Sequence, residues 1–406
     1  MQILTLAFLL LVSSGDGESV YKALDQNDST ALERYDTKKI MKAIREGRPV
    51  SKAKTGQFRL EVEDQFGRST EVIVRVPTKY PPKKGAGVLL GLPGHGGNCE
   101  QLIDLYRTYA KKQGLIIVAP TAQKTPEKDA NEDRPPPIIS ERMPHWWYYR
   151  DGNFVFTMLS RLKKEYRIDE NRVILSGYSM GGYGTWNLGL RFPDRFSALV
   201  PFAGGISRNE YLQKRDKKVR PLMRNLYNLP VYFIHGDRDY TVVVRQARET
   251  RDQLDEFGYP YEYWEEAGGG HMLNVREGSE IMNSVQKWLS PKTRKAHPKK
   301  IDHFFIGEYC SQAYWLKVEE FSSKNAQITA SITGQNIQFE GTGASRLTFY
   351  VDETLLDLSK PIRVMSGGKT IWRGKAKPSS DVILESWKAS EDRDLTYRAK
   401  ISVELD

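Results

Sequence analysis

Short apolar runs alternate with amphipathic stretches through the middle of the chain. Most of the apolar runs contain few polar residues, and the stretches between them have the length and pattern of helices. Unbroken apolar strands separated by helices are typical of βα units and of a parallel sheet buried on both faces. The predicted strands are 87–93, 115–120, 172–177, 198–203, 230–235 and 261–267, and the predicted helices lie around 99–113, 152–166, 181–192, 241–257 and 278–289.

Alternating patterns flank this region on both sides. FRLEVED and TEVIVRVP alternate apolar and polar residues around the turn at 65–68, which predicts an antiparallel hairpin. Beyond 313, short alternating strands are separated by Gly, Asn, Asp and Ser turns, which favours a small sandwich. We therefore predict a helical lead-in (16–57), a doubly wound α/β domain (58–290), a linker (291–312) and an all-β accessory domain (313–406).

The first fifteen residues have a separate character. Residues 3–12 (ILTLAFLLLV) are too short an apolar run to span a bilayer, and small residues follow at 13–15. This arrangement is typical of a signal peptide over 1–15, although the n-region carries no basic side chain. A buried N-terminal helix is the alternative. The first interpretation predicts a secreted or periplasmic protein with no membrane-spanning segment in its mature chain.

Composition narrows the possible classes of protein. The 406 residues include 11% aromatics, enough for a large core, which excludes a disordered chain. The net charge of +10 is spread without a nucleic-acid motif, so we predict no nucleic-acid partner. The histidines lack metal-ligand spacing, and we predict no metal or cofactor. The sequence has only two cysteines, Cys99 and Cys310, which excludes a framework of several disulfides. The two could pair with each other in an oxidising compartment.

The segment RVILSGYSMGGYGTW carries the most specific chemical signal. It places Ser179 in a G-x-S-x-G pattern directly after a predicted strand and before a predicted helix. A serine on such a tight turn projects its hydroxyl above the sheet edge, and glycines two residues away let backbone segments pass closely. We interpret Ser179 as a catalytic nucleophile; a glycine-rich packing turn is the alternative.

A serine nucleophile needs a base to take its proton and an acid to orient that base. The segment PVYFIHGDRDYTVV ends a strand with two candidate acids, Asp237 and Asp239. His271 follows in a glycine-rich loop after the next strand, and the remaining histidines lie outside this order. Both groups thus follow strand ends at the carboxyl edge, where α/β sites form. We predict His271 as the base.

A tetrahedral oxyanion requires two backbone donors. The segment LLGLPGHGGNCEQ turns tightly after a strand, as do the HGG-type loops of esterases. We assign one donor to the N–H of Gly97, with Gly96 as the reserve, and the other to the N–H of Met180.

These motifs resemble the α/β-hydrolase superfamily, and more narrowly a branch of secreted esterases and peptidases related to prolyl oligopeptidase catalytic domains. The resemblance covers roughly residues 58–290 and is most specific in GYSMGGYGTWNLGLRFPDRFSALVPFAGG. It implies an α/β-hydrolase fold with a mostly parallel, doubly wound sheet. The family's HG-x-x-D motif implies that Asp239, rather than Asp237, is the acid of the triad.

Two insertions are candidates for substrate selection. The segment after Pro120 contains Trp146, Trp147 and Tyr148, which could offer a stacking face to a sugar or aromatic acid, or could pack the insertion onto the sheet. A second insertion over 206–228 is rich in Lys and Arg. It could attract an anionic polymer such as a polyuronate, or it could be a solvated helix face.

The sequence therefore favours a secreted serine hydrolase acting on a small-molecule or polysaccharide-linked carboxylic ester. A peptidase of the prolyl-oligopeptidase type uses the same groups and stays open at this point. A glycan-binding or partner-binding protein on a hydrolase scaffold is the alternative from another class.

Overall fold

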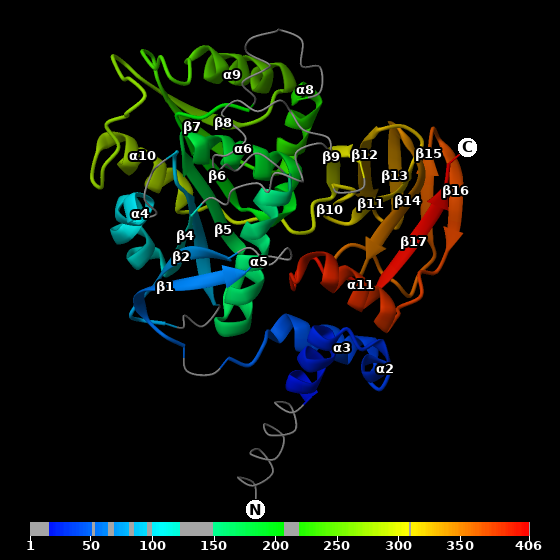
Figure 1. The fold of residues 1–406 in the computed structure, drawn as a ribbon. Coiled ribbons are helices and arrows are strands. Elements are labelled where there is room, and N and C mark those ends of the chain that lie inside the picture. The colour runs from blue at the N-terminus through cyan, green and yellow to red at the C-terminus, as the bar shows by residue number, and fades with distance from the viewer. Residues whose placement is uncertain are drawn as a thin grey trace, which may run out of the picture. The chain divides into compact units, whose positions relative to one another are not determined.

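A computed structural model describes residues 16–50, 53–63, 69–80, 85–95, 100–121, 149–206, 219–307 and 310–405. The described residues form two compact units (Figure 1). The described residues within 53–162 and 168–295 form the α/β unit, and those within 16–50, 163–167 and 296–405 form the β-sandwich unit.

The described part of the α/β unit is built on an eight-stranded sheet in the order β1-β2-β4-β3-β5-β6-β7-β8. Strands β3 to β8 pair in parallel, and β2 joins β1 and β4 in antiparallel fashion. The predicted mostly parallel sheet and the N-terminal hairpin are thereby confirmed. The strands are β1 Gly56–Glu63, β2 Ser69–Val76, β3 Ala86–Leu92, β4 Leu115–Pro120, β5 Ile168–Tyr178, β6 Ala198–Phe202, β7 Val231–Gly236 and β8 Tyr261–Glu266.

Helices cover both faces of this sheet. The strands β3, β4, β6 and β7 are buried at every residue, as a sheet with two covered faces requires. Apolar residues of α4 and α10 share one core cluster with alternate residues of the central strands, such as Leu89 and Val200. Helix α6 packs on the other face, where Gly189 lies against Leu199. The helices are α4 Glu100–Gln113, α5 Tyr149–Glu165, α6 Met180–Arg191, α8 Val219–Leu222, α9 Arg245–Phe257 and α10 Glu280–Leu289, with 3₁₀ turns at Pro193–Arg195 and Met223–Asn228.

The β-sandwich unit contains two sheets around one core. A four-stranded sheet (β10-β11-β14-β17) and a five-stranded sheet (β16-β15-β13-β12-β9) contribute alternate apolar residues to a common cluster. This pattern confirms the predicted sandwich. The strands are β9 Lys300–Ile306, β10 Gln312–Ala313, β11 Leu316–Phe321, β12 Asn325–Thr333, β13 Asn336–Thr342, β14 Ala344–Val351, β15 Ile362–Ser366, β16 Lys369–Gly374 and β17 Ala399–Glu404.

Two details of the predicted C-terminal region were wrong. Helix α11 (Ser380–Ser390) interrupts the region that we predicted to be all β, with the Ser379 hydroxyl accepting a hydrogen bond from the N–H of Asp381. Strand β9 lies within residues 291–312, which we predicted to be a linker, and it pairs along its whole length with β12. The sandwich therefore begins before residue 313.

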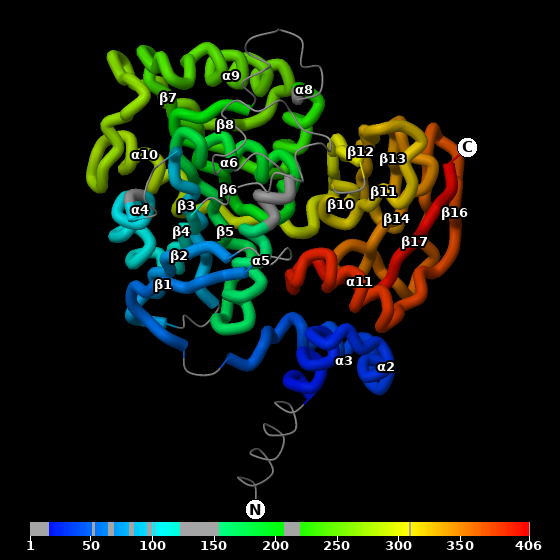
Figure 2. The backbone as a smooth tube through the Cα atoms, viewed as in Figure 1, coloured from blue at the N-terminus to red at the C-terminus, as the bar shows by residue number. Residues whose placement is uncertain are grey.

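The N-terminal helices belong to the same compact unit as the C-terminal sheets. Residues 16–26 are helical, and α2 (Ser29–Leu32) and α3 (Thr37–Glu46) follow. Their apolar residues form one buried cluster with Ile383, Leu384 and Trp387 of α11. Figure 2 shows the blue tube of α2 and α3 beside the red tube of α11.

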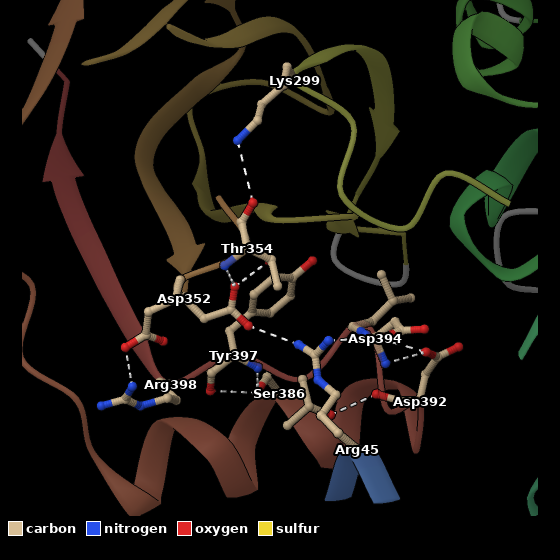
Figure 3. A network of polar contacts seen from close by, with 12 residues as sticks. Arg45, Lys299, Asp352, Thr354, Ser386, Asp392, Asp394, Tyr397 and Arg398 are labelled. Carbon is tan, nitrogen blue, oxygen red and sulfur yellow. Dashed lines mark hydrogen bonds and ion pairs between the residues drawn. The ribbon is translucent and has the colours of Figure 1, made fainter. Parts of the chain in front are cut away.

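A network of ion pairs joins α3 to the sandwich (Figure 3). The Arg45 guanidinium donates to Asp352 at 2.9 Å and to Asp394 at 3.0 Å. The Asp352 side chain is almost fully buried and also accepts from the N–H of Thr354 at 2.9 Å.

Of the helices that the structure describes, none has both the length and the apolar character needed to cross a bilayer.

Candidate active site

Ser179 occupies a sharp turn between β5 and α6. Strand β5 ends at Tyr178 and helix α6 begins at Met180, so Ser179 alone makes the connection. Its backbone has φ +54° and ψ −112°, a conformation that non-glycine residues rarely adopt. The Ser179 N–H donates to the carbonyl of Phe202 at 2.9 Å, and its carbonyl accepts from the N–H of Tyr183. The neighbouring strand and the helix thus hold the strained turn in place.

The glycines of the G-x-S-x-G pattern are required by close backbone contacts. A Cβ on Gly181 would lie 1.9 Å from the carbonyl oxygen of Leu92, and one on Gly177 would lie 2.1 Å from that of Gly181. Both distances are far below van der Waals contact with atoms that cannot rotate away. The first turn of α6 therefore packs directly against the ends of β3 and β5, which fixes the position of Ser179.

His271 connects Ser179 to Asp239 by hydrogen bonds. The His271 Nε2 lies 2.9 Å from the Ser179 Oγ, and its Nδ1 lies 2.7 Å from the Asp239 Oδ2. Both distances are those of normal hydrogen bonds. The three side chains come from different strand ends at the carboxyl edge of the sheet. The structure thus brings together the three residues that the sequence singles out, over a separation of 92 positions between Ser179 and His271.

The Asp239 carboxylate is buried and well supplied with donors. Its Oδ1 accepts from the N–H groups of Thr241 at 2.9 Å and Val242 at 2.8 Å. Burial disfavours its charged form, but hydrogen bonds from His235, His271 and Val242 outweigh this effect and hold the pKa of Asp239 well below its usual range. The carboxylate is therefore ionised across the neutral range and can stabilise a proton on His271.

The acid loop and the histidine loop are joined through their backbones. The N–H of Arg238 donates to the carbonyl of Gly269 at 2.8 Å. A Cβ on Gly236 would lie 2.4 Å from the carbonyl oxygen of Gly269, so a glycine permits this approach. The Gly269 end of the histidine loop is thereby held against the acid loop, independently of the contact between the Asp239 and His271 side chains.

Asp237, the other candidate acid, and the nearby His235 lie outside the line of hydrogen bonds from Asp239 to Ser179. Asp237, the alternative acid, makes no hydrogen bond with His271, and its buried Oδ1 has no partner among the described residues. His235 is buried behind Asp239; its Nε2 lies 2.6 Å from the carbonyl of Val242 and 3.4 Å from the Asp239 Oδ2. His235 therefore braces the acid loop.

Only part of the predicted oxyanion hole lies within the described residues. Met180 is the first residue of α6, where backbone N–H groups have no partner within the helix. A Cβ built on Gly94 would lie 3.5 Å from the Ser179 Cβ, so the end of the β3 segment passes close to the nucleophile. Gly97 and its reserve Gly96 lie outside the described residues.

Of the two insertions that we predicted to select the substrate, the structure describes only residues at the ends. Trp146, Trp147 and Tyr148 lie outside the described residues, as does Cys99, whereas Cys310 is buried. In the basic insertion, the described Arg220 pairs with Glu256, and Arg224 lies 5.2 Å from the ring centroid of Phe257. These two cations therefore have partners within the α/β unit.

Tyr178 is a residue of this region that the sequence did not single out. Its hydroxyl donates to the carbonyl of His271 and accepts from the N–H of Leu273, both at 2.7 Å. Its position next to Ser179 in the chain was the one available signal, and that signal does not reveal the direction of the side chain.

The strand order, the elbow and the residues at the carboxyl edge define an α/β hydrolase. The chain belongs to the family described as "Putative esterase", which it matches over residues 64–287.

Two curated relatives share shorter segments. An "Uncharacterized secreted protein" of Arthroderma benhamiae is 33% identical over an alignment of 116 residues, and the match covers 24% of this chain and 12% of the relative. A "Bifunctional acetylxylan esterase/xylanase" of Neocallimastix patriciarum is 25% identical over 197 residues, 46% of this chain and 25% of the relative. The chain thus matches a quarter or less of either relative's length.

Solved structures show more distant similarity. A thermostable esterase is 22% identical with a TM-score of 0.45, over 59% of this chain and 63% of the other. The S-formylglutathione hydrolase of Staphylococcus aureus is 13% identical with a TM-score of 0.44, over 60% of this chain and 99% of the other.

Proposed function

We propose that this protein is a serine hydrolase that cleaves carboxylic esters with Ser179 as nucleophile, His271 as base and Asp239 as orienting acid. The observation that supports this most strongly is the continuous line of hydrogen bonds from Asp239 through His271 to Ser179, with both distances below 3 Å. Membership of an esterase family favours an ester over an amide as the bond that is cleaved.

In the first half of the reaction, Ser179 is acylated. The His271 Nε2 takes the hydroxyl proton while the Ser179 Oγ attacks the acyl carbon, so that a tetrahedral intermediate forms. The ionised Asp239 stabilises the resulting imidazolium through Nδ1. His271 then gives the proton to the leaving alcohol, and the acyl–enzyme remains.

In the second half, water releases the acid. His271 takes a proton from water, the hydroxide adds to the acyl carbon, and the Ser179 Oγ leaves with the proton that His271 returns. In both halves we assign the N–H of Met180 to the oxyanion, because the start of α6 directs unpaired donors toward the turn. Gly97 as the second donor stays a prediction from the sequence.

The name of the Neocallimastix relative suggests the class of ester. An acetyl group on a sugar polymer, as in that relative's name, is a small acyl group on a bulky alcohol. We infer that this chain acts on a carbohydrate-linked or aromatic-acid ester. The apolar run at 3–12 and the name of the Arthroderma relative support export of the protein.

Ester turnover by matched serine variants tests this proposal. With p-nitrophenyl acetate, Ser179→Ala should lower kcat by about 10⁴-fold or more, because the nucleophile is lost and only binding and oxyanion stabilisation remain. Ser69→Ala is the control: it removes an exposed hydroxyl that bonds Glu61 on the β1–β2 hairpin, and kcat should not change. Equal turnover by wild type and Ser179→Ala would remove Ser179 from the mechanism.

Short chromogenic peptides, assayed in parallel, distinguish the two bond types. Ester cleavage with little or no peptide cleavage is the expected result. Faster turnover of a peptide than of any ester, still dependent on Ser179, would keep the triad but overturn the assignment to esters.

A further inference from the structure

We propose that Tyr178 is a positioning residue that holds the His271 loop over the nucleophile; this inference rests on the proposed function. Its hydroxyl bridges two backbone groups of that loop, the carbonyl of His271 and the N–H of Leu273. Tyr178, which directly precedes the nucleophile in the sequence, thereby sets the position of the base His271 relative to Ser179.

The two hydrogen bonds engage the phenol both as a donor and as an acceptor. The hydroxyl has one proton to donate, which goes to the His271 carbonyl at 2.7 Å, and it accepts from the Leu273 N–H at 2.7 Å. The two backbone groups lie on either side of Met272, a residue that is 79% exposed. The segment therefore has solvent on one side and the phenol on the other.

The Tyr178 ring is itself held in place by the sheet. Tyr178 pairs with Phe202 between β5 and β6, and the two rings stack with their centroids 6.2 Å apart. The Tyr178 ring also meets the His271 imidazole edge to face, with the same centroid distance. Burial raises the pKa of Tyr178 to about 12, so the hydroxyl keeps its donor proton at neutral pH.

Among the described residues, the other hydrogen bonds to the loop backbone lie at its two ends. The Gly269 carbonyl accepts from Arg238, and the N–H of Asn274 lies 3.2 Å from both carboxylate oxygens of Glu266. The Leu273 side chain packs into the core of the α/β unit. Between these anchors, Tyr178 is, among the residues that the structure describes, the side chain that binds the backbone of His271, so we assign it control of the position of the imidazole relative to the Ser179 Oγ.

Removal of the hydroxyl should therefore slow the chemical step without preventing substrate binding. In Tyr178→Phe the ring and its stacking on Phe202 are retained, while the His271 carbonyl and the Leu273 N–H lose their partner. A displacement of the base by about 1 Å can cost on the order of 10²-fold in rate, so we expect kcat to fall by about 10- to 100-fold. KM should stay within about twofold, because no contact with substrate is removed.

Covalent labelling separates positioning from folding. Wild type and Tyr178→Phe are incubated with a fluorophosphonate, and both the rate constant and the final number of labelled serines per chain are measured. We expect the rate constant to fall by about the same factor as kcat, with a final stoichiometry near that of wild type. A lowered stoichiometry with an unchanged rate constant would indicate a partly unfolded sample and would overturn the positioning role.

Tyr232→Phe is the matched control. Tyr232 lies near the start of β7 and its hydroxyl bonds Ser284 at 2.9 Å, so this variant also loses one phenol hydrogen bond within the α/β unit. Its rate constant should equal that of wild type. If Tyr178→Phe also reacts at the wild-type rate, the inference is wrong while the proposed function stands. If the wild type is not labelled at all, the proposed function itself is wrong.

Discussion

At the scale of single residues, the conformation of Ser179 is an unfavourable feature that the surrounding structure sustains. A non-glycine residue with positive φ costs on the order of 1–3 kcal/mol and persists only where neighbours determine it. Here the Phe202 carbonyl and the first turn of α6 do so. This strained backbone conformation places the Ser179 hydroxyl on the side of the sheet edge where His271 lies. The proposed mechanism requires that placement.

His303 provides a pH-dependent test of the sandwich core. It is 1% exposed, lies against Phe305 at a centroid distance of 4.4 Å, and its Nε2 has no partner among the described residues. Burial lowers the pKa of His303 to about 3, whereas an unfolded histidine has a pKa of about 6.5. Between these values the unfolded chain binds a proton that the folded chain excludes, so stability falls as the pH falls.

We therefore expect wild type to lose about 1.4 kcal/mol more per pH unit between pH 6 and 4 than His303→Leu does. Urea denaturation of both proteins at several pH values measures the difference. Above pH 7 the excess pH dependence should vanish, because both states are then neutral at this position. Parallel pH profiles from pH 7 to 4 would show that His303 takes up its proton in the folded state.

Residue types and order predicted the candidate site, but not the choice between the two acids. Asp237 and Asp239 follow the same strand, and the residues alone gave no preference between them. The turn at 239–242 decides the matter, since Asp239 accepts from two backbone N–H groups of its own loop and faces His271. Such a turn depends on dihedral angles that residue order does not specify.

At the scale of elements, the elbow depends on contact between α6 and β3. In Gly181→Ala the new Cβ would lie 1.9 Å from the carbonyl oxygen of Leu92, so helix and strand must separate. We expect a lower melting temperature and at least about a tenfold loss of fluorophosphonate labelling rate, because Ser179 moves away from His271. Gly17→Ala is the control: apart from the backbone of its own helix, no atom lies within 4 Å of its new Cβ, and neither quantity should fall. A wild-type labelling rate in Gly181→Ala would mean that the elbow tolerates this displacement.

The elements of the α/β unit were more predictable than those of the sandwich unit. The fully buried strands β3, β4, β6 and β7 appear as unbroken apolar runs. The predicted boundaries agree with those of β3 to β8 within a few residues, apart from the earlier start of β5. Helix α11 was missed because its run Val382-Ile383-Leu384 has the appearance of a strand. It is helical because Ser379 caps it and because Trp387, one turn beyond Ile383, packs on the same N-terminal helices.

At the scale of the whole molecule, the β-sandwich unit is assembled from distant parts of the chain. The described residues before 53 and after 295 belong to one unit, and the α/β unit is inserted between them in sequence. We predicted the N-terminal residues as a helical lead-in, either docked or flexible, because an amphipathic helix does not indicate which surface it covers. The contacts with Trp387 and Asp352 arise only in the folded chain.

Arg45 tests how firmly this assembly is held. Arg45→Ala leaves the buried Asp352 carboxylate without its cation, and we expect a loss of about 1–3 kcal/mol in the free energy of unfolding of the β-sandwich unit. Lys42→Ala on the same helix removes only an exposed pair with Glu46 and should cost less than about 0.5 kcal/mol. Urea denaturation of the full chain measures both. Equal effects of the two substitutions would show that the Arg45 pairs add no more than a surface ion pair.

The central claim is that Ser179 is the nucleophile of this hydrolase. It is tested most directly by treating the full chain with a fluorophosphonate, digesting it and locating the adduct by mass spectrometry. The account predicts one adduct per chain, on the peptide that carries Ser179, and its loss in His271→Ala. An adduct on a different residue, or undiminished labelling of Ser179 in His271→Ala, would contradict it.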